Sequence, residues 1–150
     1  MTGTTQGTTQ GAAVGRRVVH RRYVPYSHAH YAGNLVDGAY SLGLFGDVAT
    51  EMCILTDGDE GLFASYSDVQ FRAPVRAGDV LEVACEITRV GSRSRTLDFT
   101  VHVVARGAAT EEAPGAARML DEPLLATSAT GTVVVPDPSR SSSSGPSTDG

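Results

Sequence analysis

The stretch from His28 to Met52 carries the acidic side chains whose spacing best suits chemistry. Asp47 and Glu51 lie four positions apart, so on a helix their side chains are neighbours. Like charges at that spacing destabilise a helix unless water solvates them or a cation lies between them. Asp37 precedes them in the first turn, where the helix dipole favours an anion. Carboxylates placed in this way can exchange protons or bind a cation, and the alternative for each is a solvated face or a helix-end charge.

Small residues stand at the start of the same stretch. Glycine has no side chain to cover the backbone, so it lets a ligand approach bare N–H groups. An oxygen that gains negative charge binds well to such groups at a helix N-terminus, which then form an oxyanion hole. The candidates for this position are Gly33, Asn34, Gly38 and Ala39. The alternative is that these residues only let the helix pack closely on a sheet.

Histidines flank the entry to the predicted helix. His28 and His30 could shuttle a proton or bind a carbonyl oxygen. Their spacing also suits zinc, but no cysteine or third histidine lies nearby, so we expect no metal site. His20 and His102 fall within strand patterns and are expected to be structural or on the surface.

The charge balance of one long segment is uneven. From Tyr23 to Phe71 the chain contains no arginine or lysine. Its acidic residues are Asp37, Asp47, Glu51, Asp57, Asp59, Glu60 and Asp68. The segment therefore predicts an anionic site for a cation, although the TDGDEG stretch that holds Asp57 and Asp59 is also an ordinary turn composition.

Bulk composition narrows the class of protein. The chain has 150 residues, enough for one domain, and its 41% of hydrophobic residues supply a core. A net charge of −5 argues against nucleic acid as a partner. Cys53 and Cys85 lie in apolar stretches without metal-type spacing, so we expect buried, reduced thiols. Neither a membrane-spanning run nor a signal peptide is evident, which favours a cytoplasmic protein.

The hydrophobic pattern predicts an α+β fold. Alternating apolar residues indicate strands over 16–25, 61–74, 79–91, 94–106 and 123–136, and one long helix covers 28–52. The Gly-, Thr- and Ser-rich ends, 1–15 and 137–150, are expected to be disordered, and 106–123 to be a loop insert within the domain of residues 16–136. One helix followed by a run of antiparallel strands implies a sheet that curls around the helix.

Helical angles divide the predicted helix into two faces. At about 100° per residue, the apolar side chains fall on one broad side. They are Leu35, Leu42, Phe45, Ala49, Met52 and Cys53. Tyr40, Asp47 and Glu51 fall together on the opposite side, so the acids face away from the predicted core.

Several phrases resemble a known superfamily. A long helix followed by "FRAPVRAGDVLEV" and "VGSRSRTLDF" resembles the hotdog fold, in which a curled antiparallel sheet wraps one central helix. More narrowly, "HYAGNLVDGA", "LFGDVATE" and "DGDEGLF" resemble the beta-alanyl-CoA and 3-aminobutyryl-CoA ammonia lyases. The resemblance runs from Tyr26 to Arg106, which is most of the predicted domain.

This resemblance implies an enzyme that eliminates ammonia reversibly from a 3-aminoacyl-CoA and forms an enoyl-CoA. Asp47 is then the leading acid/base, Asp37 its rival or partner, and Glu51 a residue that tunes Asp47. The small residues at the helix start, with His28 and His30, would hold the thioester oxygen or move a proton. Glu60 lies in one of the family phrases and, with the other acids, would attract the amine.

The family comparison also leaves alternatives open. Hotdog thioesterases usually carry a Gly-Gly pair nearer to their catalytic acid than Gly38–Ala39 is to Asp47, so the choice between Asp37 and Asp47 is not settled. A hotdog acyl-CoA thioesterase and a non-catalytic acyl-CoA-binding module are the alternative functions.

The resemblance finally implies how the substrate is held. Arginine binds phosphate well, and a basic hairpin loop offers Arg89, Arg93, Ser94 and Arg95 to the phosphates of coenzyme A. A solvated basic turn is the alternative. No organic cofactor or metal is expected, since coenzyme A enters as part of the substrate. The expected assembly is a homodimer or a dimer-based homo-oligomer such as a hexamer, with the active site shared between subunits.

Overall fold

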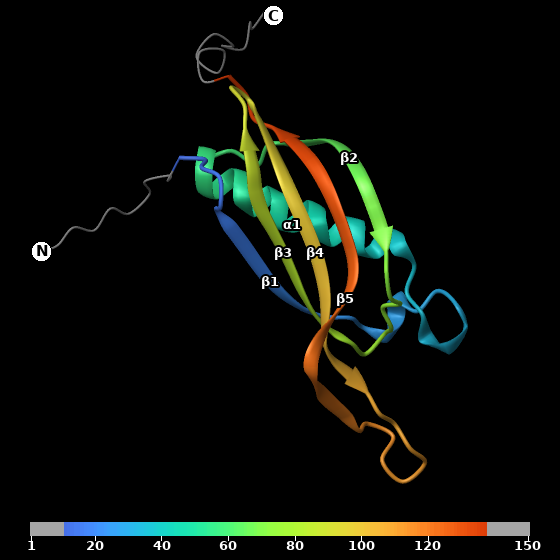
Figure 1. Cartoon of the computed structure of the whole chain (residues 1–150). Coiled ribbons are helices and arrows are strands. Elements are labelled where there is room, and N and C mark those ends of the chain that lie inside the picture. Colours follow the sequence, from blue (N-terminus) through green and yellow to red (C-terminus); the bar gives the residue numbers. More distant parts are fainter. Residues whose placement is uncertain (1–10, 138–150) are drawn as a thin grey trace, which may run out of the picture.

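The computed structural model describes residues 11–137, which form one helix and one five-stranded sheet (Figure 1). In chain order the elements are β1 (Arg17–Tyr23), two short 3₁₀ turns (Tyr26–His28 and Ala32–Asn34), α1 (Gly38–Asp57), β2 (Leu62–Phe71), β3 (Val80–Val90), β4 (Ser94–Gly107) and β5 (Ala117–Val134). All strand pairs are antiparallel. The predicted α+β class is therefore confirmed.

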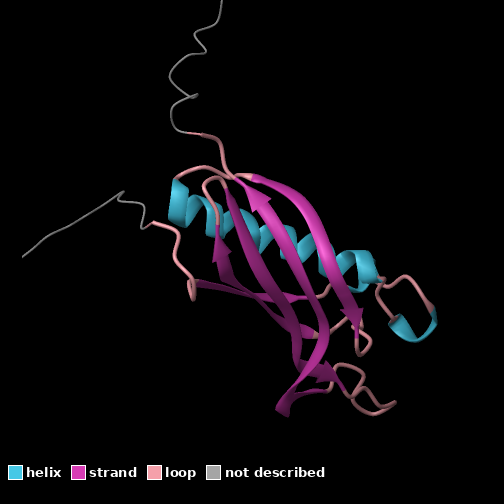
Figure 2. Ribbon diagram, turned by 45° about the horizontal axis from the view of Figure 1, so that its top comes forward, coloured by secondary structure: helices cyan, strands magenta, loops and turns pink. Residues whose placement is uncertain are grey.

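The strand order explains why the helix is long. The sheet runs β1-β3-β4-β5-β2, so β1 and β2 occupy opposite edges although α1 alone connects them. Five strands at about 4.8 Å spacing span roughly 20 Å. A helix of 20 residues is about 30 Å long. The helix can therefore cross the whole sheet, and Figure 2 shows the sheet curving about it.

The core lies between α1 and the inner face of the sheet. Phe45, Val48 and Met52 are fully buried on the helix. They meet side chains such as Leu81 and Phe99, and the Phe45 and Phe99 ring centroids lie 4.9 Å apart. The predicted apolar face is confirmed for Phe45, Ala49, Met52 and Cys53, whereas Leu42 is half-buried and Leu35 lies outside the helix.

The helix begins and ends later than the sequence predicted. A start at His28 is wrong, because Gly33 (φ 73°) and Asn34 (φ 61°) adopt left-handed conformations that a right-handed helix excludes. Asp37 caps the true N-terminus, where its Oδ1 accepts the Tyr40 N–H at 3.0 Å. The helix continues past the predicted end to Gly58, whose left-handed conformation terminates it.

The predicted loop over 106–123 is also shorter than expected. β4 continues to Gly107 and pairs with the start of β5, with Arg106 opposite Arg118 and Gly107 opposite Ala117. These strands form a two-stranded arm that projects beyond the sheet (Figure 1). The arm is mostly exposed, so it lacks the apolar alternation that marks a strand. Pro123 falls within a register shift, where the missing N–H costs no ladder bond.

The predicted disordered ends lie largely outside the described part of the chain. Residues 1–10 and 138–150 are not described. Contacts with the sheet begin before residue 16, because the Gly15 N–H donates to the Ile87 carbonyl at 2.8 Å and Ala12 packs against the core. Within residues 11–137, no helix is both long and apolar enough to cross a membrane.

Both cysteines are buried free thiols, as predicted. Burial raises the pKa of Cys53 to about 11 and that of Cys85 to about 12. Because both thiols stay protonated near neutral pH, neither is a nucleophile there. Both side chains pack in the core.

Candidate active site

A pocket of about 310 Å³ lies where α1 begins. Its lining comes from the helix start and the segment before it, from the end of β2 and the turn that follows, and from β5: Tyr31, Val36, Asp37, Gly38, Ser41, Phe71, Ala73, Pro74, Val75 and Thr127. Asp37 is the helix cap, and its Oδ2 lies 3.8 Å from His30 Nδ1. Two predicted site residues, Asp37 and Gly38, therefore share one pocket, and His30 lies beside Asp37.

The helix start offers backbone donors to that pocket. The first N–H groups of a helix have no partner within it, and here they belong to Gly38 and Ala39. The next one, of Tyr40, is already bound by the Asp37 side chain. A Cβ added to Gly38 would lie 2.5 Å from Cε1 of Phe71, so the glycine also permits close packing against β2. The predicted packing reason for a glycine therefore applies at position 38, and its role as an oxyanion donor stays a prediction.

The other two oxyanion candidates occupy a different place. Gly33 and Asn34 line a separate cavity of about 170 Å³, together with Tyr26, Arg76 and Arg106. Their left-handed backbone conformations form the turn that precedes the helix. Within one chain, the structure does not bring Gly33 and Asn34 to the N–H groups of the helix start. Their role in that chain is to form the turn.

The acids further along α1 face the edge strand β1. Arg22 Nη2 lies 2.9 Å from Asp47 Oδ2, and His20 Nε2 lies 3.1 Å from Glu51 Oε1. Alternate residues of a strand point to the same side, which explains why Arg22 and His20 both reach the helix. The prediction of an acidic segment without cations is therefore incomplete, because Arg22 lies immediately before it and balances the charge of Asp47.

Tyr40 is a further candidate site residue, to which the sequence prediction gave no role. It lies on the helix between the pocket and the Asp47–Arg22 pair, and its ring centroid is 4.6 Å from that of His28. Burial raises the pKa of Tyr40 above its ordinary value, while the Arg22 charge lowers it and the Asp47 charge raises it. The phenol thus remains a proton donor near neutral pH. Its position on the same predicted helix face as Asp47 was the available signal.

A second, larger pocket lies at the other end of α1. Its volume is about 730 Å³, and its lining residues are Asp59, Glu60, Gly61, Leu62, Ser92, Arg93, Ser94, Val134, Val135 and Pro136. Glu60 thus meets Arg93 and Ser94 from the predicted coenzyme A loop, while Arg89 is exposed on β3. A helix of 20 residues separates the two ends of α1 by about 30 Å. One chain therefore places its predicted phosphate-binding loop far from Asp37.

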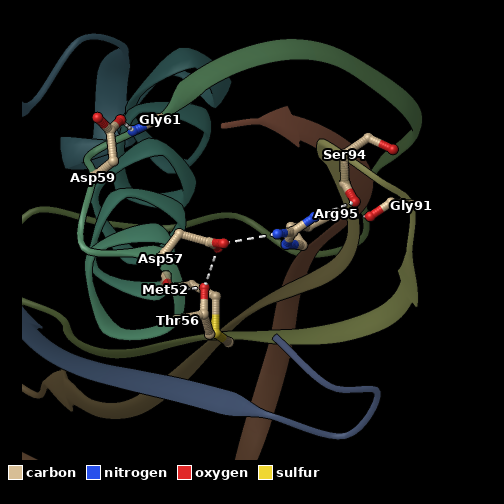
Figure 3. Close-up of polar contacts among 8 residues, drawn as sticks. All are labelled: Met52, Thr56, Asp57, Asp59, Gly61, Gly91, Ser94 and Arg95. Atoms are coloured by element: carbon tan, nitrogen blue, oxygen red, sulfur yellow. Dashed lines mark hydrogen bonds and ion pairs between the residues drawn. The ribbon is translucent and has the colours of Figure 1, made fainter. Parts of the chain in front are cut away.

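Arg95 does not face the solvent as the prediction required. Its side chain is 7% exposed, and its Nη2 donates to Asp57 Oδ1 at 2.8 Å (Figure 3). Its Nη1 donates to the carbonyl oxygens of Gly91 and Ser94, each at 3.0 Å. Arg95 therefore ties the β3–β4 hairpin to the end of α1, and its guanidinium is already engaged. Because Asp57 comes from a distant part of the chain, the sequence pattern alone could not reveal this pair.

Comparison with known proteins decides the family. The family model described as the thioesterase superfamily matches residues 33–108. The 3-aminobutyryl-CoA ammonia lyase of Acetoanaerobium sticklandii is 50% identical over 110 residues, which are 72% of this chain and 85% of that protein. This chain belongs to the thioesterase superfamily.

Solved structures agree with this membership. The beta-alanyl-CoA:ammonia lyase from Clostridium propionicum has a TM-score of 0.77 and 39% identity, and the match covers 82% of this chain and 87% of that one. A hexameric hotdog fold thioesterase of Campylobacter jejuni has a TM-score of 0.64 and 20% identity, over 79% of this chain and 81% of that one. The hotdog fold predicted from the sequence is thereby confirmed.

The predicted site residues of this thioesterase superfamily member are therefore divided between the two ends of α1. Asp37, His30, Gly38 and Ala39 gather at the helix start, and Glu60 joins the basic hairpin at the helix end. Asp47 and Glu51 lie between them on the outer side of the helix. Within residues 11–137, no group of three or more His, Cys, Asp or Glu residues is arranged to hold a metal ion.

Proposed function

We propose that this chain is a 3-aminoacyl-CoA ammonia lyase that acts on 3-aminobutyryl-CoA or beta-alanyl-CoA. The observation that carries the proposal is the 50% identity to 3-aminobutyryl-CoA ammonia lyase, which spans 85% of that relative. The geometry adds independent support, since a helix start with open N–H groups lies on the same helix as several carboxylates.

The proposed reaction divides into three tasks. A carboxylate removes the proton from the carbon next to the thioester carbonyl, and the electron pair left behind forms the new carbon–carbon double bond. The bond to nitrogen breaks, and the substrate's ammonium group leaves as ammonia. Meanwhile the thioester oxygen gains negative charge, which the N–H groups of Gly38 and Ala39 stabilise. In the reverse direction ammonia adds to the enoyl-CoA.

We assign the base to Asp47, with Asp37 as its rival. Asp37 lies beside the proposed oxyanion site, but one of its oxygens is engaged by the Tyr40 N–H. Asp47 is more than half exposed and its ion pair is with Arg22, so a substrate can reach it. Ten residues of helix separate the two acids by about 15 Å. Glu51, paired with His20, would tune the charge around Asp47.

We further propose that two subunits complete each site. Asp47 and the Arg93 loop are too far from Gly38 of the same chain for one acyl group to meet all of them. β2 lies at the sheet edge beside Gly38, and Phe71 and Leu62 expose 59% and 73% of their surface there. A second copy on this edge would cover the pocket and supply the missing side chains. The proposed assembly is a homodimer, or a dimer-based oligomer such as a hexamer.

The proposed enzyme needs neither an organic cofactor nor a metal, because proton transfer and electrostatic stabilisation suffice for this elimination. Full turnover after dialysis against a chelator would support this part of the proposal. We also propose a cytoplasmic location, since the free thiols of Cys53 and Cys85 suit a reducing compartment.

A direct assay tests the proposed function. Crotonyl-CoA or acryloyl-CoA is mixed with ammonium and the purified protein, and the loss of enoyl absorbance is followed. The proposal predicts loss of absorbance that depends on both protein and ammonium, without release of free thiol. Release of free thiol from an enoyl group whose double bond stays intact would instead identify an acyl-CoA thioesterase. Membership of the thioesterase superfamily favours this alternative.

A further inference from the structure

We propose that the buried ion pair between Asp79 and Arg106 positions the start of α1 and thereby the pocket at Asp37 and Gly38. Both residues are then positioning residues, and neither contacts the substrate. The proposal rests on the proposed function for its kinetic consequence, but its structural consequence can be measured without any turnover.

The pair is largely enclosed, since the Arg106 side chain is 20% exposed. Asp79 is 0% exposed, although it carries a carboxylate. Arg106 donates to both carboxylate oxygens, from Nε to Oδ1 at 3.0 Å and from Nη2 to Oδ2 at 2.9 Å. The Arg76 N–H donates to Oδ2 as well, at 2.8 Å. This two-pronged contact defines one geometry, so the carboxylate cannot move without breaking several bonds.

The same arginine holds both ends of a tight turn. Arg106 Nη2 also donates to the carbonyl oxygen of Pro74 at 2.8 Å, so it joins the first residue of the 74–79 turn to the last. The turn is anchored to the end of β1, because the Val24 N–H donates to the Asp79 carbonyl at 2.9 Å and the Gly78 N–H donates to the Val24 carbonyl at 2.7 Å. Arg106 lies on β4 at the base of the projecting arm. The turn is thus tied to two strands of the sheet.

The segment that leads into α1 is built on this turn. The Val36 N–H donates to the Val75 carbonyl at 2.9 Å, and the Ala77 N–H donates to the Asn34 carbonyl at 2.9 Å. Leu35 forms an isolated antiparallel bridge with Arg76. These contacts place residues 34–36 directly against the 74–79 turn. The helix cap and first helical residue follow at once in the chain, so the turn sets where they lie.

The turn is also a wall of the pocket. Pro74 and Val75 line it opposite Asp37 and Gly38. A shift of the turn would therefore move the oxyanion donors and the wall together. Misplacement of a reacting group by about 1 Å can reduce a rate by about a hundredfold.

Variants of Arg106 separate positioning from stability. Arg106→Lys keeps the charge but loses the planar fork, and we expect kcat to fall at least about tenfold while KM changes less than about threefold. Hydrogen exchange of the amides in residues 34–41 should accelerate at least about tenfold, whereas exchange in residues 91–97 should not change. Guanidinium added to an Arg106→Ala variant should restore part of the lost turnover.

Two comparisons keep the test decisive. The double variant Asp79→Asn/Arg106→Met removes both charges of the pair, so its stability should exceed that of the single Arg106 variants, yet it should retain the low kcat and the fast exchange. Ile87→Val, a fully buried position at the opposite end of the sheet, should lower stability without either effect. A variant of Arg106 that loses stability but keeps wild-type kcat and wild-type exchange over 34–41 would overturn the proposal. If the wild type shows no lyase turnover, the proposed function fails, and the exchange result alone decides the positioning role.

Discussion

Replacement of Asp47 by asparagine gives the sharpest test of the assigned base. A general base typically contributes a factor of about 10² to 10⁴ to the rate, so we expect Asp47→Asn to lower kcat by at least about a hundredfold. The side chains of Arg22 and Asp47 are 45% and 55% exposed. Breaking such an exposed pair costs at most about 1 kcal/mol, or about 4 °C in Tm for a domain of this size. Activity should therefore be lost from a protein that is still folded.

The assay measures turnover, coenzyme A binding and thermal unfolding on the same preparation. We expect coenzyme A to bind to the variant as it binds to the wild type, since the proposed phosphate-binding loop at Arg93 lies at the end of α1, away from Asp47. Glu82→Gln is the matched control, because Glu82, whose side chain is 32% exposed, forms a partly exposed pair with the neighbouring Arg21 at 3.4 Å. The control should keep full turnover. Turnover of Asp47→Asn within about threefold of wild type would refute the assignment of the base.

Four further changes test the surrounding account. Asp37→Asn retains a good helix cap but loses the carboxylate, so urea unfolding should be unchanged and kcat at least about tenfold lower; an unchanged kcat would leave Asp37 as a cap only. Gly38→Ala places a methyl group 2.5 Å from an aromatic ring of β2, and kcat/KM for the acyl-CoA should fall about tenfold in steady-state kinetics. Arg95→Met leaves the Asp57 carboxylate without its cationic partner, so urea titration should show a free energy of unfolding that is lower by about 2 to 3 kcal/mol. Unaltered stability would contradict the structural role of the pair. The pKa of Cys53 in the folded protein, about 11, exceeds its ordinary value of 9.0. The stability that the neutral thiol provides is therefore complete below pH 9 and is lost as the pH rises through 11. Cys53→Ala should make Tm less sensitive to pH over that range.

The fold was predictable because its strongest signals are local. The alternation of Val83, Cys85 and Ile87 on β3, and of Leu97, Phe99 and Val101 on β4, marks strands with one buried face, and the structure buries these side chains. The helix face carrying Phe45 and Met52 was equally clear. The projecting arm was missed because a two-stranded ribbon in solvent has no buried face and so leaves no alternation to detect.

The site was only partly predictable because its geometry depends on pairs that are distant in sequence. The sequence located Asp37, Gly38 and His30 at a helix entry, and the structure places Asp37 and Gly38 at one pocket with His30 beside Asp37. It could not reveal that Arg22 on β1 reaches Asp47, since strand and helix faces meet only after folding. Nor could it separate Gly33 from Gly38, because the left-handed conformation of Gly33 depends on the turn that residues 74–79 support.

The central claim is that this chain removes ammonia from a 3-aminoacyl thioester. Its most direct test follows 3-aminobutyryl-CoA by mass spectrometry with the purified wild-type protein and counts free thiols in the same samples. The account predicts that the thioester stays intact while its mass decreases by that of one ammonia molecule. Free coenzyme A together with intact 3-aminobutyrate would contradict the account.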